Sequence, residues 1–103
     1  MIIVKVTYTV NAGFVEQNQQ NIAAFMADFR EIAGNEFHYN IYLQADGQTF
    51  VHLSHFGNKE IQQSALNTAS FKRFQQERDN LGLVSPAQIE ELSLVDATRS
   101  PLE

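Results

Sequence analysis

The side chain in this sequence that is best suited to acid–base chemistry is His52, because an imidazole titrates near pH ~6.5 and burial shifts that value easily. It lies two residues before Ser54 in an alternating run, so both side chains point to the same face of a strand. Tyr39 and Tyr8, on two neighbouring segments, are the other polar side chains that we expect beside it. Two interpretations stay open: His52 is a general base in a pocket, or it is a core histidine hydrogen-bonded to Ser54 or Tyr39.

A hairpin between residues 37 and 56 positions these groups. Two alternating aromatic and β-branched runs flank Asp46-Gly47, a strong hairpin signal because both central residues of a type I′ turn need a positive φ. A two-residue loop sets the register and places Ile41 opposite His52. One face of the hairpin is then apolar enough to be a wall of the core; it carries Phe37, Tyr39, Ile41, Leu43, Phe50, His52, Ser54 and Phe56.

The other two histidines, His38 and His55, are opposite one another in this register. Imidazole is a common metal ligand, so the pair could form a two-ligand metal site. No third ligand is predicted near them on that face. We therefore expect no metal, and we interpret the pair as cross-strand neighbours at the end of the sheet or at a subunit interface.

The remaining segments give the order β-α-β-β-α-β. Residues 2–10 alternate as a strand, and apolar spacings of three and four then predict a helix that ends at Gly34-Asn35. Asn58 is placed to cap a helix over 59–67, a second helix begins at Thr68 or Ser70 and ends at Gly82, and residues 88–95 form the last strand. With right-handed crossovers, this order predicts a ferredoxin-like α+β domain with a four-stranded antiparallel sheet, strand order 4-1-3-2, and the helices on one face.

The helices divide into aromatic and charged faces. Phe25, Phe29, Phe71 and Phe74 have helical spacing, which indicates core positions first and pocket lining second. The charged residues are interpreted as solvated helix faces; they are Asp28, Arg30, Glu31, Lys72, Arg73, Glu77, Arg78 and Asp79.

Composition excludes several classes of function. The 103 residues fit one domain, 1–98, followed by a tail, 99–103, in which Leu102-Glu103 is a candidate cloning scar. A net charge of −5 with seven Lys and Arg argues against nucleic acid, and the lack of cysteine excludes disulfides and thiolate sites. The apolar runs are too short to span a membrane, and the first residues lack the basic start of a signal peptide, so we expect a cytoplasmic protein without membrane partners.

The sheet face opposite the helices is expected to need a partner. Ile3, Val51 and Leu53 lie there among polar side chains such as Thr7, Thr49 and Asn40, which makes the face more apolar than a solvated sheet requires. A second copy of the chain is the simplest partner, so we expect a homodimer.

Three segments resemble the antibiotic biosynthesis monooxygenase family. Residues 50–61 and 66–74, ending in Ser70-Phe-Lys-Arg-Phe74, resemble its strand and the start of its later helix, and residues 1–14 resemble its first strand and turn. The resemblance implies a dimeric α+β barrel, in which two sheets pack face to face and each subunit keeps a pocket between sheet and helices. Members include cofactor-independent monooxygenases that act on quinols and polyketide-like aromatics, and haem-degrading enzymes.

The resemblance implies a function and a site. The expected function is that of a small cofactor-independent monooxygenase acting on an electron-rich aromatic, with His52 as the catalytic base and no cofactor. The alternative is a non-catalytic dimeric barrel that binds a small hydrophobic ligand. The expected pocket lining comprises Tyr8, Tyr39, Ser54, Phe25, Phe29, Phe71 and Phe74.

The sequence also departs from the family. Phe56 and Ser54 stand where the family often has Trp and Glu, and a frequent helix histidine falls on Ala65. The Asn, Trp and His of the haem-degrading branch fall on Val6, Ala65 and Gln75. Haem degradation is therefore not expected, and the missing helix histidine leaves His52 as the candidate base.

Overall fold

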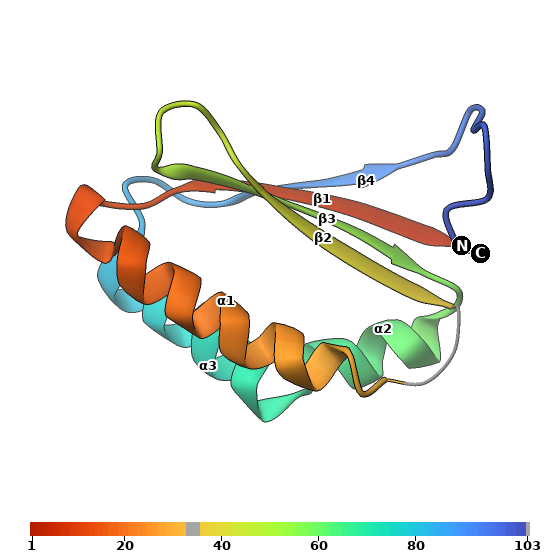
Figure 1. Ribbon diagram of the computed structural model, residues 1–103, viewed down its shortest axis with the longest axis horizontal. Coiled ribbons are helices and arrows are strands. Elements are labelled where there is room, and N and C mark those ends of the chain that lie inside the picture. Colours follow the sequence, from red (N-terminus) through yellow and green to blue (C-terminus); the bar gives the residue numbers. More distant parts are fainter. Residues whose placement is uncertain (33–35, 103) are drawn as a thin grey trace.

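The computed structural model describes residues 1–32 and 36–102, and it has two layers (Figure 1). A four-stranded sheet forms one layer, with strands β1 (Ile2–Thr9), β2 (Phe37–Leu43), β3 (Thr49–Phe56) and β4 (Gln88–Leu92). The other layer contains α1 (Val15–Phe29), α2 (Lys59–Leu66) and α3 (Ala69–Glu77), with short helical turns η1 (Ala12–Phe14) and η2 (Arg78–Gly82). The predicted helix end at Gly34-Asn35 lies outside the described residues.

The predicted sheet topology is confirmed. The strand order is β2-β3-β1-β4, every pairing is antiparallel, and Ile41 faces His52 as expected. The register follows from alternation, because a slip of one residue would turn every core side chain to the other face. The last strand is shorter than predicted and ends at Leu92. Leu43 was expected in the core wall but is 43% exposed, because it lies at the end of its strand.

The predicted type I′ turn is wrong, although the register that it implied is right. Gly47 is the only described residue with a positive φ, and the Gln44 amide donates to the Thr49 carbonyl to close a longer loop. The Asp46 carboxylate accepts from the backbone amides of Gln48 and Thr49 and from the Thr49 hydroxyl. These local bonds stabilise a loop in which Asp46 keeps a negative φ.

Aromatic side chains fill the space between the layers. Phe25 is fully buried, and its ring contacts Phe29, Phe71 and Phe74. Asn58 caps α2 as predicted, because its side chain accepts from the Ile61 amide at 3.0 Å. These contacts place α1 and α3 side by side against the helix-facing side of the sheet (Figure 1).

The helix that begins at Ala69 changes its hydrogen bonding before it ends at Gly82. The Leu83 amide donates to the Arg78 carbonyl, five residues back, so η2 is a wider π-helical turn. Such turns are rare and occur often at functional sites. Arg78, interpreted from the sequence as solvated, is 8% exposed, and that interpretation is wrong.

The outer face of the sheet is partly apolar. Ile3 is 6% exposed, and Val51 and Leu53 are half-buried, whereas Tyr42 is 55% exposed. Thr49, one of the polar side chains predicted on this face, is buried, and its hydroxyl bonds Thr9 and Asp46. Among residues 1–32 and 36–102, no helix is long and apolar enough to cross a membrane.

Candidate functional site

His52 lies at the centre of the interior and is held by two tyrosines. Its side chain is 2% exposed, Nε2 lies 2.7 Å from the Tyr8 hydroxyl, and Nδ1 lies 2.7 Å from the Tyr39 hydroxyl. Phe74 stacks on the imidazole at a centroid distance of 5.4 Å. Of the two bonding partners predicted for a core histidine, the structure has Tyr39; Ser54 instead donates to the Val4 carbonyl.

The orientation of the Asn18 amide sets the direction of this network. Asn18 Nδ2 donates to the Tyr8 oxygen at 3.0 Å, so the Tyr8 proton remains available for His52 Nε2. A neutral imidazole has one N–H and one bare nitrogen, so Nδ1–H then donates to the Tyr39 oxygen. With Asn18 Nδ2 facing Tyr8, the reverse direction would leave the proton of Tyr8 without an acceptor at a side chain only 2% exposed; the other amide atom, Asn18 Oδ1, is buried without a partner. The Tyr39 O–H is thus the free end of the chain, with no acceptor among the described residues.

Burial keeps all three titratable groups of the network neutral. It lowers the pKa of His52 from 6.5 to about 3, and the positive charge of Arg78 adds to the shift. Burial also raises the pKa of Tyr8 and of Tyr39 far above the ordinary tyrosine value. The imidazole is therefore unprotonated at neutral pH, as a base must be, but an imidazolium would be unstable there.

Arg78 adds a buried positive charge beside this network. Its guanidinium carbon lies 5.1 Å from the centroid of Tyr8 and 5.2 Å from that of Phe74, within cation–π range. Nε donates to Asp79 Oδ1 at 2.9 Å, and the two terminal nitrogens have no acceptor among the described residues. The sequence did contain a signal for this position, because Phe71, Phe74 and Arg78 are spaced by three and four on one helix face.

A pocket of about 580 Å³ opens over Arg78, and we call it the Arg78 pocket. Its walls come from η2, the following loop and the helix-facing side of β4, where Ile89 is 73% exposed. The lining comprises Arg78, Asp79, Leu83, Val84, Ser85, Pro86, Ala87 and Ile89. The pocket thus combines mainly apolar walls with the ion pair of Arg78 and Asp79, a composition common in small-molecule sites.

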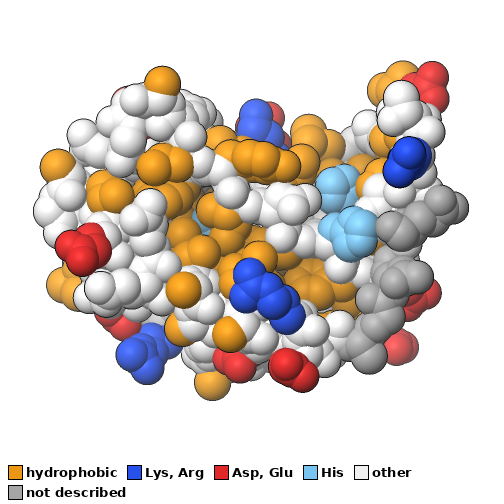
Figure 2. Space-filling view, in the orientation of Figure 1, with side chains coloured by type: hydrophobic (Ala, Val, Ile, Leu, Met, Phe, Trp, Pro, Cys, Tyr) orange, Lys and Arg blue, Asp and Glu red, His pale blue; other side chains and the backbone are white. Residues whose placement is uncertain are grey.

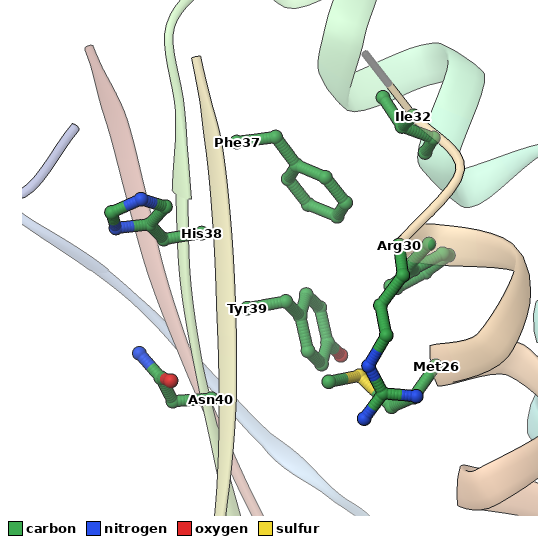
Figure 3. Close-up of a pocket in the computed structure, with 8 residues that line it drawn as sticks. Met26, Arg30, Ile32, Phe37, His38, Tyr39 and Asn40 are labelled. Carbon is green, nitrogen blue, oxygen red and sulfur yellow. The ribbon is translucent and has the colours of Figure 1, made fainter. Parts of the chain in front are cut away.

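A second hollow of about 430 Å³ lies between the end of α1 and β2, and we call it the α1–β2 cavity. Figure 3 shows Met26, Arg30 and Ile32 facing Phe37 and Tyr39 across this space, while His38 and Asn40 point to the other side of the strand. Phe29 also lines it. Figure 2 shows hydrophobic side chains along the seam between the helix layer and the sheet, with basic side chains at its edge.

The structure brings the predicted site residues together, but few of them line a hollow. Phe29 and Tyr39 line the α1–β2 cavity, and His52 lies behind Tyr39. The other predicted residues are buried. Ser54 lies near His52 on the same strand, and the rest are packed in the core around His52: Tyr8, Phe25, Phe71 and Phe74. The catalytic role of His52 stays a prediction. Any contact between this base and a ligand has to pass through Tyr8 or Tyr39.

His38 and His55 face one another across β2 and β3, as the predicted register requires. Partial burial and the neighbouring His38 lower the pKa of His55. In the part of the chain that the structure describes, no group of three or more His, Asp or Glu side chains is arranged to hold a metal ion.

Comparison with known proteins establishes the fold of the chain. No protein-family model matches the sequence, and no curated protein matches it. Among solved structures, Pseudomonas aeruginosa PA3566 has a TM-score of 0.76 at 21% identity, covering 92% of this chain and 94% of its own. An antibiotic biosynthesis monooxygenase has a TM-score of 0.77 at 11% identity, covering 93% of this chain and 100% of its own. Mycobacterium tuberculosis Rv0793 has a TM-score of 0.79 at 15% identity, covering 95% of this chain and 98% of its own.

The chain has the antibiotic biosynthesis monooxygenase fold. The subunit fold expected from the resemblance is therefore confirmed over nearly the whole chain, and the dimer stays a prediction. At identities of 7% to 21%, the comparisons describe the fold, and the chemistry has to be argued from the side chains.

Proposed function

We propose that this protein is a small cofactor-independent monooxygenase of the antibiotic biosynthesis type, acting on a phenol or hydroquinone bound in the Arg78 pocket. The observation that carries the proposal is the buried guanidinium of Arg78, which has free terminal nitrogens under apolar walls and lies beside the network of Tyr8 and His52. Oxygenation without a cofactor begins with a deprotonated, electron-rich aromatic. The terminal nitrogens of Arg78, whose Nε is paired with Asp79, would stabilise that anion.

The substrate supplies all four electrons in this reaction. A hydroquinone reacts with O₂ to give a hydroxyquinone and water: one oxygen atom enters the ring, and the other leaves as water with two hydrogens from the substrate. The phenolate forms first and transfers an electron to O₂. Arg78 assists by lowering the pKa of the bound phenol, because an adjacent opposite charge favours the ionised form.

The hydrogen-bond network offers a route for the phenol proton. In the proposed route the substrate hydroxyl reaches past Arg78 to the buried Tyr8 oxygen, which accepts its proton while the Tyr8 proton moves to the bare Nε2 of His52. Because the His52 pKa is lowered to about 3, the imidazole cannot retain this proton, and Nδ1 passes one on to Tyr39. Tyr39 then releases a proton into the α1–β2 cavity. In this scheme His52 is a relay base that acts through two tyrosines.

A second candidate function is ligand binding without catalysis. The enclosure of His52 favours it, because both ring nitrogens are already bonded and the side chain is 2% exposed. In that case the Arg78 pocket would hold a small anionic or phenolic ligand and exchange no electrons with it.

Oxygen consumption with hydroquinones separates the two functions. The parent should consume O₂ faster than the protein-free solution, and Arg78→Gln should lose most of the difference, whereas Arg73→Gln, on the exposed face of α3, should keep it. His52→Ala should remain folded and lose roughly 10²–10⁴-fold, the contribution of a positioned acid or base. No oxygen consumption in a parent protein that binds the hydroquinone would leave the binding function instead.

We also propose that the protein is a homodimer through the outer face of its sheet. The half-buried Val51 and Leu53 and the neighbouring Ile3 give this face an apolar centre, which a second sheet would cover. Light scattering at micromolar concentration should give about twice the chain mass of 11.7 kDa. A monomer of 11.7 kDa would contradict the dimer and leave the Arg78 proposal unaffected.

A further inference from the structure

The α1–β2 cavity has the side chains of a ligand site that the proposed reaction does not use. Phe29, Phe37 and Tyr39 give it aromatic walls, and Met26 adds a polarizable apolar side chain. Its volume of about 430 Å³ lies in the range of small-molecule pockets. Aromatic walls of this kind favour a flat, apolar ligand body.

The polar groups that face the cavity are donors. Arg30 extends from the end of α1 into the same space as Tyr39, and no ion pair involves it among residues 1–32 and 36–102 (Figure 3). The direction of the His52 network leaves the Tyr39 O–H without an acceptor. The other polar lining residues, His38 and Asn40, point to the far side of β2 (Figure 3). Among the described side chains that line the cavity, none offers an acceptor facing these two donors, so a ligand with an acceptor group would complement them.

We propose that the α1–β2 cavity is a second binding site, for a small aromatic carboxylate. The aromatic body lies against Phe29 and Phe37, and the carboxylate accepts from the Arg30 guanidinium and the Tyr39 hydroxyl. Arg30 suits this role because its planar fork matches a carboxylate with two parallel hydrogen bonds.

This ligand would also act on the network behind Tyr39. A carboxylate that accepts from the Tyr39 O–H completes the chain of hydrogen bonds from Asn18 through Tyr8 and His52. Occupation would then block the release of a proton at that end of the relay. The site is therefore an inhibitory one if the proposed reaction takes place, but binding itself does not depend on the reaction.

A matched pair of probes tests the site without any redox chemistry. 2-Naphthoate and 2-naphthamide share the ring and differ in charge, and neither is a phenol that the proposed reaction could oxidise. Calorimetry should show that the carboxylate binds at least about tenfold more tightly than the amide, the advantage of a charge-assisted hydrogen bond. Arg30→Gln should remove this advantage, and Arg99→Gln, an exposed arginine of the tail, should keep it.

Chemical-shift mapping of the backbone amides locates the probe. Binding should shift the signals of Phe29, Arg30 and Phe37, and Arg78→Gln should leave that binding unchanged. Equal affinities for the two probes, no effect of Arg30→Gln, or shifts confined to residues 83–87 of the Arg78 pocket would each overturn the proposal. Because these experiments measure binding, a result against the carboxylate site can be distinguished from a result against the proposed oxygenation, which is measured by oxygen consumption.

Discussion

Acidification should destabilise this protein through His52 well before its carboxylates are protonated. Burial lowers the pKa of His52 from 6.5 in the unfolded chain to about 3 in the folded protein. Below pH 6.5, the unfolded state binds a proton that the folded state does not bind. The stability that this difference contributes is fully present above the pKa of the unfolded chain. It is lost as the pH falls from there towards the pKa of the folded protein.

The magnitude follows from the size of the pKa difference. At pH 5.0, about 1.5 units below the unfolded value, the loss is about 2 kcal/mol, since one unit corresponds to about 1.4 kcal/mol. This is a large fraction of the ~5–15 kcal/mol that holds a typical domain folded. Urea denaturation at pH 7.5 and pH 5.0, at one protein concentration, measures it directly.

A variant separates His52 from the other histidines. The lowered pKa of His55 acts in the same direction, so the parent alone cannot assign the effect. His52→Gln keeps one donor and one acceptor for the two tyrosines, and its stability should change about 2 kcal/mol less than that of the parent between the two pH values. An NMR titration of the parent gives the same information without a variant: the imidazole of His52 should stay neutral down to about pH 4. An imidazole that titrates near pH 6.5 would refute the reasoning.

The remaining predictions concern the same interior. Tyr39→Phe should cost about 1–3 kcal/mol in urea denaturation, because it leaves one imidazole nitrogen of His52 unpaired, and Tyr8→Phe should cost more, because Asn18 also loses its acceptor. Equal costs would contradict this order. Gly82→Ala should lower the melting temperature, because a Cβ at residue 82 would overlap the buried Phe14 ring; Gly13→Ala, which meets nothing within 4 Å, is the matched control and should change little.

The strand register of the sheet could be predicted from the sequence because the alternation of apolar and polar residues is compatible with one register only. Alternation of apolar and polar residues fixes which face of the hairpin is buried, and a slip by one residue would expose Phe50 and Phe56. The turn could not be predicted in the same way. Its type depends on whether Asp46 adopts a positive φ or uses its carboxylate to bind the next two amides, and both choices preserve the register.

The candidate site was predicted in part, and the reason lies in how charge was interpreted. His52 and its two tyrosines follow from the register of the hairpin and the position of β1. Arg78 has the spacing of a core position after Phe71 and Phe74. Because an arginine is rarely buried unless it is paired, its charge led to the prediction that it is exposed to solvent. What offsets that tendency is tertiary: two aromatic rings lie beneath the guanidinium, and Asp79 binds Nε.

The burial of Arg78 is difficult to explain as a stabilising feature alone. Its side chain is 10% exposed and forms one ion pair, with an Asp79 side chain that is 52% exposed. The guanidinium loses much of its hydration, although its terminal nitrogens stay accessible in the Arg78 pocket, and one partly solvated carboxylate and two ring faces offset only part of that cost. An apolar side chain of similar size would fill the same space without the desolvation cost. The charge is therefore better explained by an acceptor that enters the Arg78 pocket, which is why the proposed function places the substrate there.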